Sequence, residues 1–490
     1  MNTSVRLGSS GSTNQRFWKS MIFLLLSIQA ISVLGGVIDE DRFYFIGLSA
    51  IVLIIPGIYQ VMSQDAELFS PMNLIFLNLF FGVFLQTIVL CFYSDLNPNL
   101  FLDPTYDFAI IATGMAAIAI AVIFLTLGYS FNIRKNYVTR RAGGAPKSAV
   151  QTIVEWPRKK VVILAALFGA ITLACLIHYV VTIGFFDDLS RFSVKRNNVE
   201  GGSGLMFSRF GMRFAQVACI VLFAYHIAHS KMGMKSGVLY ITVILFVLAS
   251  AGPFVSSSRS LLLYFFVALF IVHHVLSGGW RAKQMNVALV MVLAVIIAMG
   301  ALRFIQQRSV TYAEYSEDIG VGRSVGRIAV TNNFLGIKKT SVLLDIVPSQ
   351  EAHSYGATYL LWLVAPIPRS LWPEKPTVRI GGVLGAKVYG TRDTNGIPPG
   401  FVGEAYYNFG WLGIPFVAFL FGAGIRWFYE SFGKRSYSNS RSLLFYSVLL
   451  IPVAFASISS DFTGFVSRTA QLMIPLLIAI KIIGIKRRVR

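Results

Sequence analysis

The chain has 490 residues, of which 55% are hydrophobic and 13% charged, and its formal net charge is +21. A soluble domain needs a largely polar surface, and this composition supplies too few charged side chains to cover one. It therefore excludes an ordinary soluble protein and predicts a polytopic membrane protein, in which the excess positive charge reports membrane topology and requires no nucleic acid.

Apolar stretches long enough to cross a bilayer recur along the whole chain. They predict an all-α polytopic membrane protein with about twelve transmembrane helices. The first stretch follows Arg16 and Lys19 and lacks a small-residue cleavage site, so we expect an uncleaved anchor and not a signal peptide. The expected spans are residues 20–38, 43–62, 71–93, 108–131, 161–184, 211–230, 237–255, 260–277, 285–302, 411–428, 442–458 and 469–485.

The distribution of basic residues predicts the orientation. With both termini in the cytoplasm, the strongly basic stretches 134–160 and 486–490 lie inside, as the positive-inside rule requires. The expected organisation is a cytoplasmic N-terminus (1–19), helices one to nine (20–302) with a basic outward loop at 185–213, a large extracytoplasmic loop (303–410), helices ten to twelve (411–485) and a cytoplasmic tail (486–490).

Outward basic residues concentrate in two loops. Long loops are largely exempt from the topology rule, but the exemption does not explain why the charge gathers there. The first loop holds Arg191, Lys195, Arg196, Arg209 and Arg213. The second holds Arg303, Arg308, Arg323, Arg327, Lys338, Lys339, Arg369, Lys375, Arg379, Lys387 and Arg392.

The large loop is too long to be structureless, so we expect short helices on the outer membrane face. The stretch 359–376 is too interrupted by proline to span, and Trp362 and Trp372 suit the headgroup level. Arg369 beside this interface can bind phosphate in a forked geometry, and Lys375 can add a point charge. A lipid-linked pyrophosphate is the expected ligand; ordinary anchoring to anionic headgroups is the alternative.

One carboxylate stands in the stretch GIPPGFVGEAYYNFG (396–410). We expect its glycines and prolines to form a turn with special backbone angles, and Tyr406, Tyr407 and Trp411 to offer flat faces for sugar rings. Glu404 can then act as a base toward a hydroxyl. Alternatively, Glu404 pairs with an outward arginine and holds the loop together.

Arg259 follows three serines between two expected helices, with almost no loop to hold it away from the membrane. An idle charge is costly there, so a nest of hydroxyls and guanidinium could accept a phosphate or a sugar oxygen. A snorkelling arginine at the interface is the alternative.

Other chemistries have little support in the sequence. Asp39 and Asp41 could bind a divalent metal, but short acidic runs are usually solvated loop ends. No nucleotide, zinc or nucleophile motif stands in a plausible context, so we expect no cofactor and no metal. No Asp or Glu falls inside the expected spans, which argues against proton-coupled transport.

Several local strings point to one family. They are HSYGATYLLWLVAPIPRSLWPEKP, RIGGVLGAKVYG and GIPPGFVGEAYYNFGWLG between residues 353 and 413, and SSSRSLLL after a central helix. They resemble the Wzy-type O-antigen polymerases, also called oligosaccharide repeat-unit polymerases. Some members have an arginine and a glycine separated by ten residues in each of two outer loops, and Arg191 to Gly202 and Arg379 to Gly390 match that spacing.

The resemblance implies a metal-independent glycosyltransferase of the C-type membrane class in the bacterial inner membrane, with its active site facing the periplasm. Its substrates would be oligosaccharides linked to undecaprenyl pyrophosphate, and a chain-length regulator and a flippase of the same pathway would be its protein partners, besides membrane lipids. Glu404 and Arg259 are the expected catalytic residues. The expected substrate-binding residues are Arg191, Arg196, Arg303, Arg369, Lys375, Arg379, Tyr406 and Tyr407.

Two alternatives remain open. An O-antigen ligase shares this layout but transfers finished glycan to lipid A core. A flippase or other transporter would move a lipid-linked sugar without joining it to another.

Overall fold

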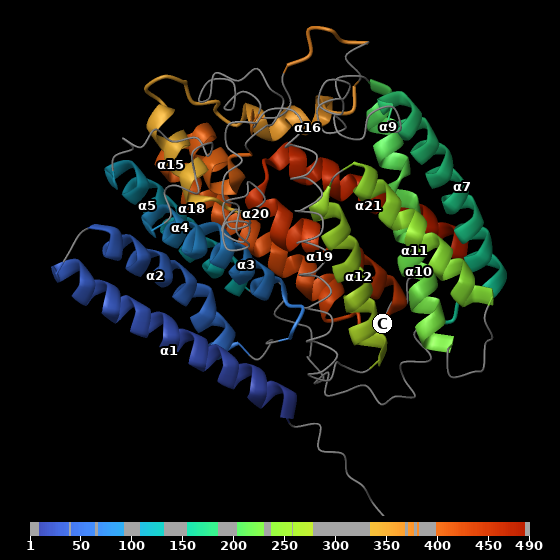
Figure 1. Ribbon diagram of the computed structural model, residues 1–490, viewed down its shortest axis with the longest axis horizontal. Helices are drawn as coiled ribbons and strands as arrows, with labels where there is room; N and C mark the ends of the chain where they lie inside the picture. Colours follow the sequence, from blue (N-terminus) through green and yellow to red (C-terminus); the bar gives the residue numbers. More distant parts are fainter. Residues whose placement is uncertain are drawn as a thin grey trace, which may run out of the picture.

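The computed structural model is helical throughout the residues that it describes, with no β-strand among them (Figure 1). The described residues are 9–38, 41–63, 67–92, 108–131, 154–184, 203–229, 237–256, 258–277, 334–367, 371–376, 380–381 and 398–485.

The long helices of the first half are α1 (Ser9–Ile38), α2 (Asp41–Met62), α5 (Phe108–Ser130), α7 (Arg158–Ile183), α10 (Arg213–His229), α11 (Gly237–Val255) and α12 (Arg259–Ser277). A further continuous helix consists of α3 (Pro71–Leu79), the π-helical η1 (Phe80–Leu85) and α4 (Gln86–Phe92), and α9 (Ser203–Gly211) leads into α10. The second half contains α15 (Ile337–Ile346), η5 (Ala357–Leu360), α16 (Leu361–Val364), α18 (Gly400–Phe428), η6 (Tyr429–Gly433), α19 (Ser440–Ile451), η7 (Pro452–Ala456), α20 (Ser457–Ser459) and α21 (Phe462–Ile483).

Ten helices in the described part of the chain are long and apolar enough to cross a membrane, and each overlaps one expected span. The chain is thus a multi-pass membrane protein, as its composition predicts. The first expected span lies within α1, whose apolar part, Phe17–Ser32, is shorter than the other ten. The expected span at 285–302 lies outside the described residues.

Two boundaries differ from the expected spans. The helix expected over 411–428 begins at Gly400, and the helix expected from 469 begins at Phe462. In both extensions, polar or small side chains interrupt the apolar pattern. Such side chains are tolerated because the extensions are buried against other protein segments and not against lipid. As a result, Glu404 lies in a helix and not in the loop that precedes it.

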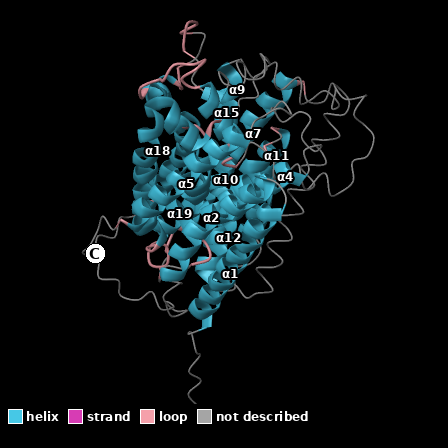
Figure 2. Ribbon diagram, turned by 90° about the vertical axis from the view of Figure 1, so that its left-hand side faces the viewer, coloured by secondary structure: helices cyan, strands magenta, loops and turns pink. Residues whose placement is uncertain are grey.

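The described helices pack as two groups, each around its own apolar core. The first contains α1, α2, α3, α5, α15 and α18, and the second contains α7, α10, α11, α12, α19 and α21. In Figure 1 the late helices, drawn in orange and red, lie between the blue and green ones. Figure 2 shows the helices running along a common direction, with α9 and α15 at one end, here named the α15 end.

The α5 and α18 helices cross with their backbones almost in contact. A side chain on Gly128 would collide with the carbonyl of Phe419, and one on Gly422 would collide with the carbonyl of Leu125. Without a hydrophobic driving force between helices in lipid, small residues at a crossing allow the close contact that holds them together.

Substituting one of these glycines should loosen the crossing. We expect Gly422→Ala to destabilise the protein by about 1–3 kcal/mol, because its Cβ must displace the α5 backbone. Gly424→Ala is the matched control, since nothing lies within 4 Å of its Cβ position. Thermal unfolding of the detergent-solubilised variants measures the difference, and equal melting temperatures would contradict this account of the crossing.

Candidate functional site

At the α15 end, α18 begins as a short helical segment that breaks at Gly410. This glycine has φ 62° and ψ −153°, and Gly400 at the start of the helix has φ 72°. Both values lie in a region that glycine adopts without strain. The special backbone angles expected in this stretch are confirmed. They make residues 400–409 a separate short helical segment, which carries Glu404.

The broken helix end is joined to the segment 353–358. Carbonyl groups before a break lose their partners in the helix. Here the carbonyl of Tyr407 accepts from Ser354 N at 3.0 Å and that of Asn408 accepts from Tyr355 N at 3.1 Å. The amide of Asn408 also donates to the carbonyl of Glu404 at 2.7 Å. The segment 353–358 thus supplies partners for two of the carbonyls next to the break.

The Glu404 carboxylate is buried at 1% exposure, and both of its oxygens accept hydrogen bonds. The Thr358 hydroxyl donates to Oε1 at 3.0 Å, and the backbone N–H of Phe462 donates to Oε2 at 2.6 Å. Thr358 in turn accepts from the amide of Asn408 at 2.7 Å. Because Phe462 is the first residue of α21, the carboxylate satisfies an N–H that the start of that helix leaves without a helical partner. The carboxylate therefore fastens α18, α21 and the segment before α16.

Three further predicted site residues hold the same region together. The Tyr406 hydroxyl donates to the carbonyl of Val347 at 3.1 Å, and the Tyr407 hydroxyl donates to Glu351 Oε1 at 3.4 Å. The ammonium of Lys375 donates to the carbonyls of Ala365 and Ile367. Their described contacts are thus with protein, and their roles toward sugar and pyrophosphate stay predictions.

Beside this network lies a row of four basic side chains from three parts of the chain, here named the cation row: Arg209, Arg213, Lys339 and Arg468. Arg213 is near enough to both Arg209 and Arg468 for their charges to repel, and Arg468 is likewise near Lys339. Tyr264 of α12 interacts with the guanidinium of Arg468.

Four hydrogen bonds join the cation row to neutral acceptors. Lys339 donates to the carbonyl of Ser459 at 3.1 Å, and Arg468 donates to the Ser460 hydroxyl at 2.7 Å. Arg213 reaches Gln216 Oε1 at 3.4 Å. Arg209 similarly reaches the Tyr179 hydroxyl at 3.4 Å. The neutral acceptors of Arg213 and Arg468 satisfy hydrogen-bond donors of these two residues but leave their charge in place.

The charge of Lys339 is costly where it stands. The residue is 8% exposed and lies in the first turn of α15, at the positive end of a helix. Burial, together with the positive charge of Arg468, lowers the pKa of its ammonium to about 7, and the negative charge of Asp461 opposes both effects. An anion bound here would stabilise the charged form.

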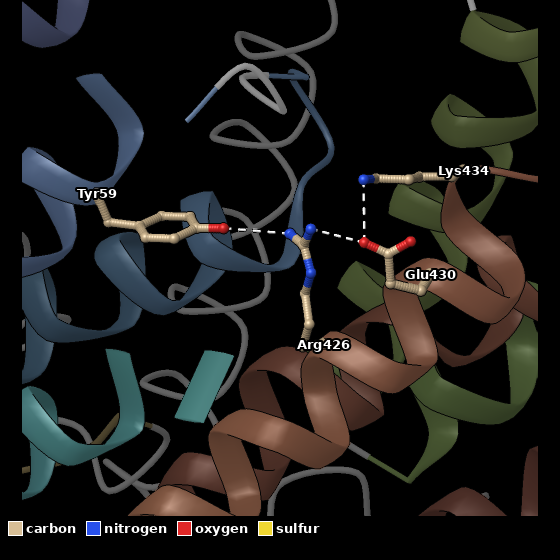
Figure 3. Close-up of polar contacts among 4 residues, drawn as sticks. All are labelled: Tyr59, Arg426, Glu430 and Lys434. Atoms are coloured by element: carbon tan, nitrogen blue, oxygen red, sulfur yellow. Dashed lines mark hydrogen bonds and ion pairs between the residues drawn. The ribbon is translucent and has the colours of Figure 1, made fainter. Parts of the chain in front are cut away.

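A buried arginine at the opposite end of the bundle shows the contrast (Figure 3). Arg426 forms an ion pair with Glu430 at 2.6 Å and donates to the Tyr59 hydroxyl at 3.1 Å. Glu430 also pairs with Lys434 at 3.0 Å. The chain thus neutralises Arg426 internally, whereas Arg213 and Arg468 form no ion pair with the described residues.

Five predicted binding residues lie outside the described residues: Arg191, Arg196, Arg303, Arg369 and Arg379. Arg259 begins α12, the helix that also brings Tyr264 to the cation row, and its side chain is not described.

The metal alternative gains no support from the described residues, where no group of three His, Cys, Asp or Glu could hold an ion. Asp39 lies outside them, and the side chain of Asp41 is not described.

The sequence analysis named Arg209, Arg213 and Lys339 among the outward basic residues but assigned none of the four cation-row residues to the site. It also did not single out Thr358, Asn408 or Asp461. A signal was present for Arg213 and Arg468, since each stands at the start of an apolar span, where charge is costly. Thr358 and Asn408 give no such signal, because their importance comes from the break at Gly410.

No family model, curated protein or solved structure matches this chain. The family resemblance therefore depends on the local strings in the sequence, and the function follows as a proposal from the site.

The Glu404 network can be tested by its stability. We expect Glu404→Ala to destabilise the protein by about 2–3 kcal/mol, because the Phe462 N–H and the Thr358 hydroxyl lose their acceptor in a buried place. Glu404→Gln should cost less, since an amide can accept from Phe462 and donate to Thr358. Thermal unfolding in detergent checks the order, with the exposed Glu374→Ala as the control. Equal losses for Ala and Gln would contradict the network.

Proposed function

We propose that this chain is a membrane glycosyltransferase that polymerises oligosaccharide repeat units linked to undecaprenyl pyrophosphate. The observation that carries the proposal is the cation row, placed beside a buried carboxylate network at one end of a bundle of membrane helices.

The cation row favours an anionic ligand of high charge. Arg213 and Arg468 form no ion pair with the described residues, and the like charges of the row repel one another. Removing such charges from water costs several kcal/mol per ion unless an opposite charge compensates. A pyrophosphate supplies that charge, and arginine donors match its oxygens in bidentate geometry. Stabilising pyrophosphate as a leaving group is the main requirement of this reaction.

The surroundings of the row favour a lipid-linked ligand. The row lies where apolar helices end, so a pyrophosphate bound there can keep its hydrocarbon chain in the membrane. The segment 357–372 nearby exposes large apolar side chains, including Leu360, Leu363 and Leu371. Such a surface suits contact with lipid at the interface.

The charge distribution supports an outward-facing site. At the opposite end, α7 begins with Arg158, Lys159 and Lys160, and further basic residues follow η6 and precede the end of α21. By the positive-inside rule we expect that end to be cytoplasmic, and the proposed site at the α15 end would then face the periplasm.

In the proposed reaction, a hydroxyl of the lipid-linked acceptor unit attacks the anomeric carbon of the lipid-linked donor glycan. A new glycosidic C–O bond forms, and the bond between the anomeric carbon and the pyrophosphate oxygen breaks with its electron pair on that oxygen. The cation row binds the departing undecaprenyl pyrophosphate. Arg259 and the outward-loop arginines are further candidates for the two lipid-linked substrates, and Tyr406 and Tyr407 for the sugars.

The direct experiment incubates the purified protein in nanodiscs with the lipid-linked repeat unit extracted from the source cells, with and without EDTA. We expect a glycolipid ladder that survives EDTA. Product formed only when lipid A core is added would indicate a ligase. If no ladder forms, movement of the glycolipid across the bilayer in sealed proteoliposomes would indicate a flippase.

The cation row makes a sharper prediction. Arg468→Ala and Lys339→Met should each lower ladder formation by about 100-fold or more, because loss of one donor to a developing anion costs that much. Both variants should also bind undecaprenyl pyrophosphate more weakly. Lys159→Ala, an exposed lysine at the opposite end, is the control. Inorganic pyrophosphate and liposomes of anionic lipid serve as separate competitors, which distinguish the pyrophosphate group from a headgroup surface.

The pKa of Lys339 predicts a pH dependence. Below about 7 its ammonium is charged and attracts the anion, and above that pH the free protein loses this charge, so affinity for undecaprenyl pyrophosphate should fall as pH rises through neutrality. The groups that face Lys339 are Arg468 and Asp461, while α18 faces it with Gly400. Lys339→Arg keeps the positive charge, so its affinity for undecaprenyl pyrophosphate should decrease less with rising pH than that of the wild type. Parallel pH profiles would contradict the assignment.

A further inference from the structure

Asp461 occupies the N-cap position of α21 but does not cap it. An aspartate at this position ordinarily accepts a hydrogen bond from the first turn of its helix. Here the side chain makes no cap hydrogen bond, although the residue is 5% exposed. Its carboxylate lies over Gly464, where any side chain would collide with it. Among the described residues it accepts no hydrogen bond at all.

The reason lies in Glu404. Its carboxylate reaches across from α18 and accepts the N–H of Phe462, so an acid at the start of α21 is already supplied from another helix. The carboxylate of Asp461 is therefore not needed as a second acceptor for the first N–H groups of α21. Two neighbouring acids thus have different surroundings: Glu404 is saturated with protein donors, and Asp461 is not.

Asp461 also stands between the two halves of the site. Its charge acts on Glu404 on one side and on Lys339, a member of the cation row, on the other. Two residues along α21, the Thr463 hydroxyl is buried and has no hydrogen-bond partner among the described residues. Buried polar groups normally find partners, so this corner of the site offers an acceptor and a hydroxyl that the protein does not use.

We infer that Asp461 is the catalytic base, which takes the proton from the attacking sugar hydroxyl, while Glu404 is a positioning residue that holds the start of α21. The inference rests on the proposed polymerase function and replaces the sequence-based expectation that Glu404 is the base. Under this inference, the acceptor sugar binds next to Asp461.

The proton transfer completes the step. The acceptor O–H bond breaks as its oxygen bonds to the anomeric carbon, and the proton passes to a carboxylate oxygen of Asp461. The negative charge leaves on the pyrophosphate, which the cation row binds. Lys339 is near both Asp461 and Arg468, so it can attract the departing pyrophosphate beside the base.

The test compares initial rates of ladder formation with binding of undecaprenyl pyrophosphate. Asp461→Asn should lower the rate by about 100-fold or more, the usual contribution of a general base, and leave that binding and the melting temperature unchanged. Asp461→Glu should restore part of the rate and keep the acid limb of the pH–rate profile that Asp461→Asn lacks. Glu404→Gln should retain most of the rate. Asp345→Asn, an exposed aspartate on α15, is the control.

The outcomes separate the two proposals. A ladder at the wild-type rate from Asp461→Asn, or a loss of rate in Glu404→Gln alone, overturns the role of Asp461 and leaves the polymerase intact. An equal loss of lipid binding or stability in Asp461→Asn shows a structural residue and likewise overturns it. If the wild-type protein forms no ladder from its substrate, the proposed polymerase function is wrong, and the proposed role of Asp461 is wrong as well.

Discussion

A single buried carboxylate determines how the α15 end is assembled. Glu404 accepts one hydrogen bond from the segment before α16 and one from the start of α21, while Asn408 closes the same network from one turn further along α18. These segments are far apart in the chain, and each would otherwise bury a polar group without a partner. The positions of Asp461 and Arg468, both on α21, therefore depend on a residue of another helix.

The two ends of the bundle treat buried positive charge differently. At the opposite end, Arg426 has an acid four residues away and aromatic rings around it. At the α15 end, the positive charges come from α9, α10, α15 and α21, members of both packed groups, and meet where the groups join. A ligand that binds all four thus touches both groups, so its binding is coupled to how they pack against each other.

The sequence predicts the membrane class and, in the described part of the chain, most of the spans, because lipid-facing helices must be apolar over a fixed length. It predicts the starts of α18 and α21 poorly, since those turns are buried in protein and need no apolar run. The special angles at Gly400 and Gly410 follow from a local glycine and proline pattern. The pairing of Glu404 with Phe462 depends on contacts across 58 residues of chain, which no local pattern encodes.

The burial of α15 between earlier and later helices has a consequence for how the protein is assembled. This ten-residue helix is largely buried: its Ser341 lies against Gly114 of α5, and its Lys339 and Leu343 lie against Gly400 and Gly403 of α18. It is too short to be integrated by the translocon as a spanning helix. Its walls include α18, which is synthesised after it. The segment therefore reaches its final place only after α18 has been made and has packed beside α5, so the site is completed late in assembly.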